Sequence, residues 1–429
     1  MKNILVFPCG SEIGLDIYRC VQYSTYFRLI GGSSVDDHGK FVYNDYIGSI
    51  PFVNAPDFLP VMKKIVAEHS IDAIYPATDL AIDVLKKLEP ELGCKVISSA
   101  SETTDVCLSK RKTYALLQDI IRIPKQYNVA NIDSFPIFIK PDIGHSAIGA
   151  EKISSQAELE NRLADGDDIL LLEYLPGEEY TVDCFTDRKG KLQYVGARVR
   201  KRVKSGISVN TSFVDSKEEF RSFAEAINEK IRFRGAWFYQ VKRDKEGELC
   251  LLEVASRFGG SSLLSCALGV NLPLLSLFDA FDYDVEVLPN EYRVELDRAF
   301  SNKYKLDINY STIYVDYDDC MILEQRYVNV ELVQFIFQCH NKGKRIVLLS
   351  KHDGDLQSEL KQFRIEDIFD EVIHISRDEQ KCDYVIDKDS RTNLLNALRS
   401  EHKALLHALI WLWEQLELRI VIHGRHVGS

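Results

Sequence analysis

Residues 138–149 read FIKPDIGHSAIG, a stretch in which an apolar strand runs into a loop of small residues. We expect the strand to extend from Phe135 to Lys140, which places the lysine ammonium group at the start of the loop. Gly144 and Gly149 let backbone N–H groups approach phosphate oxygens, and the lysine adds a positive point charge. The stretch predicts a phosphate-binding loop, although an ordinary turn beside a surface lysine fits it equally well.

A second segment, residues 171–183, reads LLEYLPGEEYTVD and has acidic residues on both sides of a Pro-Gly turn. The pattern predicts a strand, a tight turn and another strand, which bring Glu173 and Glu179 toward one cleft. Carboxylates suit an adenine amine and ribose hydroxyls, because both of these groups donate hydrogen bonds. The alternative is a hairpin with solvated acidic side chains.

The third segment consists of GAWFYQVK at residues 235–242 and LLEVASRFGG at residues 251–260. Both parts contain an apolar strand, and the two strands carry Gln240 and Glu253. Oxygen ligands on neighbouring strands suit Mg²⁺ when phosphate oxygens complete its coordination shell. Arg257 follows the second strand, and a guanidinium group there can stabilise charge on a transferring phosphoryl group.

Together the three segments resemble the ATP-grasp superfamily, of the carbamoyl-phosphate-synthetase-like carboxylate–amine ligase type, over residues 1–290. The resemblance implies ATP and Mg²⁺ as cofactors. It also implies a reaction in which a small-molecule carboxylate is phosphorylated to an acyl phosphate and then attacked by an amine. The implied ATP contacts are Lys110, Lys140, Gly144, Ser146, Gly149, Glu173, the backbone of Leu175, and Glu179. The implied Mg²⁺ ligands are Gln240 and Glu253, and the implied catalytic residues are Lys140 and Arg257.

One position departs from the family pattern. Ala255 stands where the family commonly has an asparagine that binds the metal. Either a water replaces this ligand or a second Mg²⁺ binds weakly. The same departure is the feature that favours a different class of protein, a nucleotide-binding regulator without ligase activity.

The first 100 residues or so predict a Rossmann-like domain. Apolar strands are expected at Ile4–Phe7, Ile71–Tyr75 and Lys95–Ile97, and helices at Leu15–Tyr26 and Leu80–Leu88. The glycines of the first turn, residues 10–14, do not have the spacing of a dinucleotide-binding loop. We therefore expect a structural turn or one wall of a substrate cleft.

A basic run lies farther along the chain. Arg198, Arg200 and Arg202 alternate, so on a strand they face one side. This face is either a pocket for an anionic substrate or a solvated strand edge.

A new strand begins after the polar stretch 289–309, which we interpret as a linker. Residues 313–321 read IYVDYDDCM and place Asp316 and Asp318 directly after this strand. Further strands are expected at Arg345–Leu349, Glu371–Ile375 and Tyr384–Ile386. The second of the four strands ends at Ser350, Lys381 precedes the last, and DKDS follows at residues 387–390.

This order resembles the haloacid-dehalogenase (HAD) phosphatase superfamily over residues 310–429. It implies Asp316 as nucleophile and Asp318 as general acid and base, with Ser350 and Lys381 holding phosphate. Asp316, Asp318, Asp387 and Asp389 are the implied Mg²⁺ ligands. The intervals between the motifs are too short for a cap domain. Cys320 replaces a usual threonine and Lys388 interrupts the last motif, so an inactive scaffold is the alternative.

Composition limits the remaining functions. The chain has 429 residues, 45% hydrophobic and 28% charged, and its net charge of −12 argues against nucleic-acid binding. Ten cysteines without metal-ligand spacing predict reduced thiols and a cytoplasmic location. The apolar stretch 404–422 contains Glu414, Glu417 and Arg419, so no membrane span is expected. A homodimer is the oligomer expected from base rates.

The predicted fold class is therefore α/β, with four parts. Residues 1–105 form a Rossmann-like pre-ATP-grasp domain, and residues 106–290 form an ATP-grasp fold of two α+β subdomains. Residues 291–310 are the linker, and residues 311–429 form a capless HAD-like Rossmannoid domain.

Overall fold

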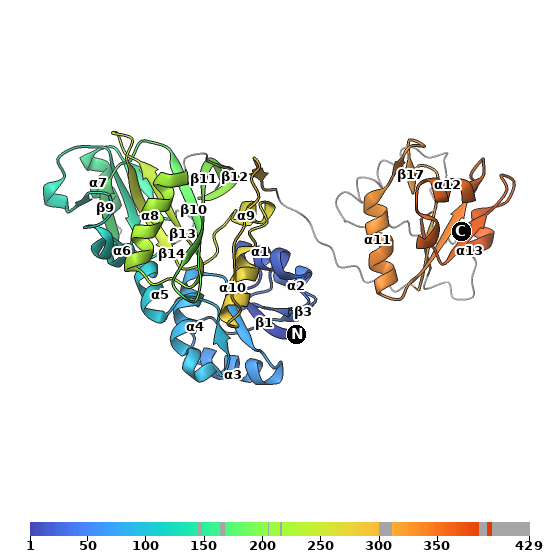
Figure 1. Cartoon of the computed structure of the whole chain (residues 1–429), viewed down its shortest axis with the longest axis horizontal. Coiled ribbons are helices and arrows are strands. Elements are labelled where there is room, and N and C mark those ends of the chain that lie inside the picture. Colours follow the sequence, from blue (N-terminus) through green and yellow to red (C-terminus); the bar gives the residue numbers. More distant parts are fainter. Residues whose placement is uncertain are drawn as a thin grey trace. The chain divides into compact units, whose positions relative to one another are not determined.

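The computed structural model describes residues 1–144, 148–163, 168–204, 206–214, 217–299, 311–385 and 393–396. The chain divides into two compact units, Met1–Ala299 and Phe300–Ser429 (Figure 1). Among the described residues, no helix has the length and apolar character needed to cross a membrane.

The first unit opens with a five-stranded parallel sheet in the order β3-β2-β1-β4-β5. Its central strand is buried from Ile4 to Phe7, as expected where helices cover both faces of a parallel sheet. The strands are β1 (Lys2–Phe7), β2 (Phe27–Gly32), β3 (Asp45–Ile47), β4 (Ala73–Pro76) and β5 (Lys95–Val96). The helices are α1 (Glu12–Val21), α2 (Gly39–Val42), α3 (Phe58–Glu68) and α4 (Asp79–Leu92).

The three strands predicted for this front domain are confirmed. Helix α4 is also confirmed, and it runs four residues beyond Leu88 to Leu92, before Gly93 adopts a φ of 75°. The first helix begins earlier than predicted, because the Ser11 side chain caps it by accepting from the Gly14 N–H at 3.0 Å. It ends at Val21, before the predicted Tyr26.

Two sheets follow the front domain, linked to it by α5 (Ser101–Leu108) and α6 (Lys110–Leu117). The smaller sheet has the order β6-β9-β7-β8 and carries the predicted phosphate-binding strand. Its elements are β6 (Gln126–Tyr127), η1 (Val129–Asn131), β7 (Ile137–Pro141), β8 (Glu151–Ile153), α7 (Gln156–Leu163) and β9 (Ile169–Glu173).

The larger sheet is antiparallel, with six strands in the order β14-β13-β10-β11-β12-β15. Helix α10 contacts both β13 and α1, so it joins this sheet to the front domain (Figure 1). The strands are β10 (Glu179–Thr186), β11 (Leu192–Lys204), β12 (Ile207–Phe213), β13 (Gly235–Arg243), β14 (Leu249–Ala255) and β15 (Glu295–Asp297). The helices are α8 (Lys217–Lys230), α9 (Leu263–Ala267) and α10 (Leu272–Ala280).

Two interpretations of the sequence are corrected in this region. Strands β9 and β10 do not form a hairpin; they belong to different sheets, and the Pro176-Gly177 turn carries the chain from one to the other. Residues 295–297 are not linker, because they pair with Ser212, Thr211 and Asn210 as strand β15. Short polar strands of this kind lack the apolar alternation by which a strand is found in a sequence.

The second unit contains a parallel sheet in the order β20-β19-β16-β21. Its strands are β16 (Thr312–Val315), β19 (Arg345–Ser350), β20 (Glu371–His374) and β21 (Asn393–Asn396), and β17 (Ile322–Leu323) pairs with β18 (Tyr327–Val328) apart from it. The helices are α11 (Val330–Asn341), α12 (Leu356–Gln362), η2 (Glu366–Ile368) and α13 (Lys381–Val385).

The strands predicted at residues 312–315, 345–349 and 371–375 are confirmed. The strand predicted to begin at Tyr384 is wrong, because Tyr384 lies in helix α13. A short apolar run fits either element, and here β21 occupies the place beside β16.

Candidate active site

Lys140 lies at the end of β7, where the small sheet meets the large one. Its side chain is 7% exposed, and its Nζ donates to the Leu252 carbonyl of β14 at 2.7 Å. Burial lowers the pKa of Lys140 to about 8, while the negative charge of Glu253 opposes this shift. Charges on Lys110 and Glu179 also act on it. Three predicted site residues, Lys110 of α6, Glu179 of β10 and Glu253 of β14, are therefore near enough to Lys140 for their charges to act on its pKa.

Gln240 and Glu253 are directly opposite each other on β13 and β14. Both are half-buried, and the Gln240 Oε1 accepts from Arg200 at 3.1 Å. The described ranges contain no group of three or more His, Cys, Asp or Glu side chains arranged to hold a metal ion. The chain thus offers one carboxylate and one amide oxygen here, with the buried Ala255 two residues beyond Glu253.

The two predicted nucleoside contacts already have partners in the protein. Glu173 accepts from the Arg122 guanidinium at 2.9 and 2.7 Å and from the Lys125 backbone N–H at 3.1 Å. Glu179 pairs with Arg200, which also contacts Gln240. The sequence interpretation missed Arg122 because it lies in a short loop without a motif.

The remaining predicted ATP contacts surround the same strand end. The Lys110 Nζ donates to the Asp142 carbonyl at 3.0 Å, and Leu175 is buried. Gly149 has a φ of 73°, a conformation that favours glycine, and Gly144 precedes an undescribed segment. Ser146 lies outside the described residues.

Arg257 is fixed by a residue of the front domain that the sequence did not suggest. Its Nε and one terminal nitrogen donate to the two carboxylate oxygens of Asp79, at 2.8 and 2.9 Å. Asp79 is the first residue of α4, so this bidentate pair ties α4 to the segment after β14.

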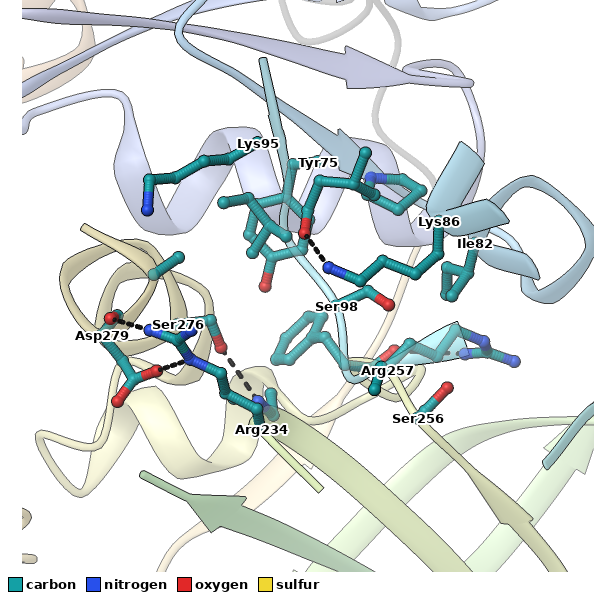
Figure 2. Close-up of a pocket in the computed structure, with 18 of the residues that line it drawn as sticks. Tyr75, Ile82, Lys86, Lys95, Ser98, Arg234, Ser256, Arg257, Ser276 and Asp279 are labelled. Carbon is teal, nitrogen blue, oxygen red and sulfur yellow. Dashed lines mark hydrogen bonds and ion pairs between the residues drawn. The ribbon is translucent and has the colours of Figure 1, made fainter. Parts of the chain in front are cut away.

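Arg257 also lines a cavity of about 230 Å³ between the front domain and the large sheet (Figure 2). Arg234 and Asp279 pair on one side of this cavity, and Lys86 hydrogen-bonds the Val96 carbonyl. Among the residues named above for ATP, metal and catalysis, Arg257 is the one that lines it. The cavity is therefore distinct from the place where Lys140 and Glu253 converge.

The basic run on β11 does not present one uniform face. Register shifts between Arg200 and Val203 separate Arg202 from the other two arginines. Arg198 is 1% exposed; its Nε donates to Asp183 at 2.8 Å, and Asp183 also accepts from Ser262 at 2.5 Å. Arg202 is exposed and pairs with Asp297. Over the described residues, one buried nitrogen of Arg198 and the Nε of Arg200 have no hydrogen-bond partner.

In the second unit, Asp316 lies just after β16 and forms an ion pair with Lys381 at the start of α13. Burial raises the pKa of the Asp316 carboxyl, and the Lys381 charge opposes that shift. The buried Ser350 Oγ accepts from the His352 backbone N–H at 3.2 Å. Asp387 and Asp389 lie outside the described residues.

His352 is a residue of this cluster that the sequence interpretation missed. Its ring nitrogens lie 3.0 Å from Asp318 and 3.0 Å from Glu359. Partial burial disfavours the charged ring, but hydrogen bonds and charges of the two carboxylates outweigh burial and raise the pKa of His352.

Comparison with known proteins connects the first unit to a family. Residues 165–299 match the family described as ATP-grasp in the biosynthetic pathway with Ter operon. A D-alanine–D-alanine ligase of Thermotoga petrophila is 27% identical over 143 residues, which cover 31% of this chain and 47% of the relative. D-alanine–D-alanine ligase B of Clostridium perfringens is 22% identical over 182 residues, or 37% of this chain and 56% of the relative. The chain thus spans about half the length of these curated relatives.

Solved structures share the fold at low identity. Biotin carboxylase from Campylobacter jejuni, solved as a β-γ-ATP complex, has a TM-score of 0.57 and 16% identity over 67% of this chain and 72% of its own. The biotin carboxylase domain of the 2-oxoglutarate carboxylase of Hydrogenobacter thermophilus, solved with MgADP, has a TM-score of 0.57 and 14% identity. The match covers 67% of this chain and 71% of that chain. An L-amino acid ligase from Bacillus licheniformis has a TM-score of 0.54 and 17% identity, over 66% of this chain and 74% of that chain. Met1–Ala299 therefore has the ATP-grasp fold, and its sequence is similar to an ATP-grasp family and to D-alanine–D-alanine ligases.

Proposed function

We propose that Met1–Ala299 is an ATP- and Mg²⁺-dependent ligase that joins a small-molecule carboxylate to an amine. The observation that carries the proposal is a set of contacts between the two sheets. Lys140 donates to the Leu252 carbonyl next to Glu253, and Arg200 joins Glu179 to Gln240, which lies opposite Glu253. Similarity to D-alanine–D-alanine ligases and to an L-amino acid ligase supports this reaction class.

The side chains of Lys140, Gln240 and Glu253 suit the binding of a nucleoside triphosphate and one metal ion. Lys140 is a buried cation whose charged form is disfavoured by desolvation, so an anion beside it gains more than beside a solvated lysine. Glu253 and Gln240 present adjacent oxygens, which suits Mg²⁺ when phosphate oxygens supply the other ligands. Ala255 leaves that shell one protein ligand short, which favours a single tightly held ion.

When bound, MgATP supplies the phosphoryl group that turns the carboxylate into an acyl phosphate, which the amine then attacks. In this scheme Lys140 and Lys110 hold phosphate oxygens. Arg257, oriented by Asp79, stabilises negative charge that develops on the transferring group. Glu173 and Glu179 accept from the adenine and ribose, in exchange for contacts they now make with Arg122 and Arg200.

The test is ADP release by the full chain with MgATP and a panel of amino acids and carboxylated sugars, singly and in pairs. Release that requires one carboxylate and rises with one amine supports the ligase. Lys140→Ala should abolish this release, because it removes the buried cation. Lys245→Ala, which removes an exposed lysine paired with Glu246, should leave it unchanged. Undiminished turnover in Lys140→Ala would sink the proposal.

A nucleotide-binding regulator is the competing function, and Ala255 favours it. It predicts MgATP binding without ADP release for every substrate pair. Binding measured by calorimetry alongside the release assay therefore separates the two functions.

For the second unit we propose a phosphohydrolase activity of the HAD type. The supporting observation is the ion pair between Asp316 and Lys381, residues far apart in the chain. Ser350 ends β19, the strand that pairs with β16, and the charge of Asp318 acts on Asp316. A cation next to the attacking carboxylate offsets its repulsion from phosphate. Asp316→Asn should eliminate hydrolysis of an aryl phosphate, whereas Asp353→Asn, an exposed partner of Arg377, should not. Hydrolysis that persists in Asp316→Asn would assign it to another site.

A further inference from the structure

Two cysteine thiols from distant parts of the chain are in contact where helix α1 of the front domain lies against helix α9, which follows the large sheet. The sulfurs of Cys20 in α1 and Cys266 in α9 lie 3.4 Å apart, although 246 positions separate the residues. Both residues are free cysteines. No step of the proposed ligase reaction uses either of them.

The backbone on both sides of this contact is held by hydrogen bonds. The Asn271 side chain, at the start of α10, donates to the Cys20 carbonyl at 2.7 Å. The Cys266 carbonyl accepts from the Gly269 N–H at 2.9 Å. Apolar residues of α1 and α10, including Ile17 and Leu272, are buried in the same core. The two sulfurs are therefore kept in contact by the fold rather than by a chance side-chain conformation.

Both cysteines are partly accessible to solvent, and the pKa values of their thiols differ. Cys20 and Cys266 are both partly exposed, in contrast to the buried Cys184 and Cys250. The hydrogen bond between the two thiols lowers the pKa of Cys266 and, together with burial, raises the pKa of Cys20. Because the thiolate is the reactive form of a cysteine, the sulfur that loses its proton first is the one that attacks an oxidant.

We propose that Cys20 and Cys266 are a modification site that closes to a disulfide when a hydroperoxide reaches it. The thiolate of one cysteine of the pair attacks a peroxide oxygen, the O–O bond breaks, and a sulfenic acid forms. The departing oxide takes a proton and leaves as water from hydrogen peroxide or as an alcohol from an alkyl hydroperoxide. The sulfur of the other cysteine then attacks the sulfenic sulfur, so the S–S bond forms and the S–O bond breaks. The released hydroxide takes the proton of that second thiol and leaves as water. The two sulfurs are oxidised and the peroxide is reduced.

The bond would tie α1 to α9, which follows the segment carrying Arg257 and Ser262. A cross-link between residues 246 positions apart lowers the conformational entropy of the unfolded chain. The native state needs little rearrangement to form it, because the two sulfurs already lie 3.4 Å apart. Lys140, Gln240 and Glu253 are not touched. The disulfide would thus covalently link the front domain to the part of the chain that carries the large sheet. It does not depend on the proposed ligase activity.

The experiment treats the full chain with a small excess of hydrogen peroxide, then titrates thiols and maps tryptic peptides without reduction. Residues 20–28 and 258–293 form peptides with one cysteine each, so their linkage is unambiguous. We expect two of the ten thiols to be lost and these peptides to be joined. The thermal midpoint of unfolding should rise by about 5 °C and fall back with dithiothreitol.

Cys20→Ser and Cys266→Ser should each prevent the linkage and the rise in midpoint, whereas Cys94→Ser, which removes another partly exposed thiol, should retain both. The reversal by dithiothreitol tests the wild-type chain, so the result does not depend on the variants folding. A map in which the two peptides stay separate, or one that joins either to another cysteine, would overturn the proposal.

Discussion

Lys140 differs from an ordinary lysine in that its side chain is buried and its pKa is lowered. Burial brings its pKa to about 8, so between pH 8 and the ordinary value near 10.5 the folded protein binds fewer protons at this group than the unfolded chain. The penalty of the buried charge is fully present below pH 8 and is relieved as the pH rises through that range. Lys140 therefore makes the unbound protein more stable with rising pH.

The same shift predicts the pH dependence of nucleotide binding. Phosphate oxygens need the charged ammonium, so affinity for MgATP should fall by about tenfold between pH 7 and pH 9 as Lys140 loses its proton. Calorimetric titration at pH 7, 8 and 9 measures this. Lys140→Arg keeps its charge throughout and should show a nearly flat profile, and an equally steep fall in that variant would assign the effect to another group.

The buried ion pair of Arg198 and Asp183 predicts a stability effect. Arg198→Ala leaves the Asp183 carboxylate buried with Ser262 as its remaining side-chain partner, so the free energy of unfolding should drop by about 3 kcal/mol. Arg202→Ala, at the exposed end of the same strand, should cost less than about 1 kcal/mol. Urea unfolding followed by tryptophan fluorescence compares the two variants. Similar losses in both would contradict the burial argument.

At the scale of elements, the pair between Asp79 and Arg257 makes helix α4 part of the candidate site. Asp79→Ala frees the guanidinium, and misplacing such a group should lower the turnover number by about 10- to 100-fold. The double variant with Arg257→Ala should be no slower than Arg257→Ala alone, because Asp79 acts through the arginine. Steady-state kinetics of the three variants decides this; additive losses would indicate a separate role for Asp79.

Helix α10 depends on Asn271 for its first turn. The Asn271 Oδ1 accepts from the Leu274 N–H at 3.1 Å, while its amide group donates to Cys20. Asn271→Ala removes both contacts and should destabilise the first unit by about 1–2 kcal/mol. Asn271→Asp retains the cap and should lose less. Thermal unfolding of both variants provides the measurement, and equal midpoints would mean that the cap contributes little.

At the scale of the whole molecule, the boundary at Ala299 has a consequence for truncation. A chain ending at residue 290, the end predicted from sequence, lacks β15 and Arg298, whose guanidinium contacts Glu12 at 3.4 Å and the buried Asp16 at 3.2 Å. The 1–290 chain should unfold at a lower temperature than the 1–299 chain. Scanning calorimetry of both truncations tests this, and identical midpoints would show β15 to be dispensable.

The chain pattern by itself determined the α/β class and the position of most strands. Apolar runs identified β1, β7 and β13, because the burial pattern of a strand is set by residues next to one another in the chain. Strand β7 begins at Ile137, two residues later than the expected Phe135. The sequence also pointed to Lys140, at a strand end before a glycine-containing loop, and to Glu253, through the resemblance of the three segments to the ATP-grasp superfamily.

Tertiary structure alone decided the partners of the charged residues. Arg257 meets Asp79 across 178 positions, and Glu173 meets Arg122 across 51. It also placed β9 and β10 in different sheets, and made a strand of residues 295–297. The physical reason is that an ion pair or an edge strand is stabilised by a partner brought near in space, whereas hydrophobic periodicity reports only how a segment faces its own neighbours.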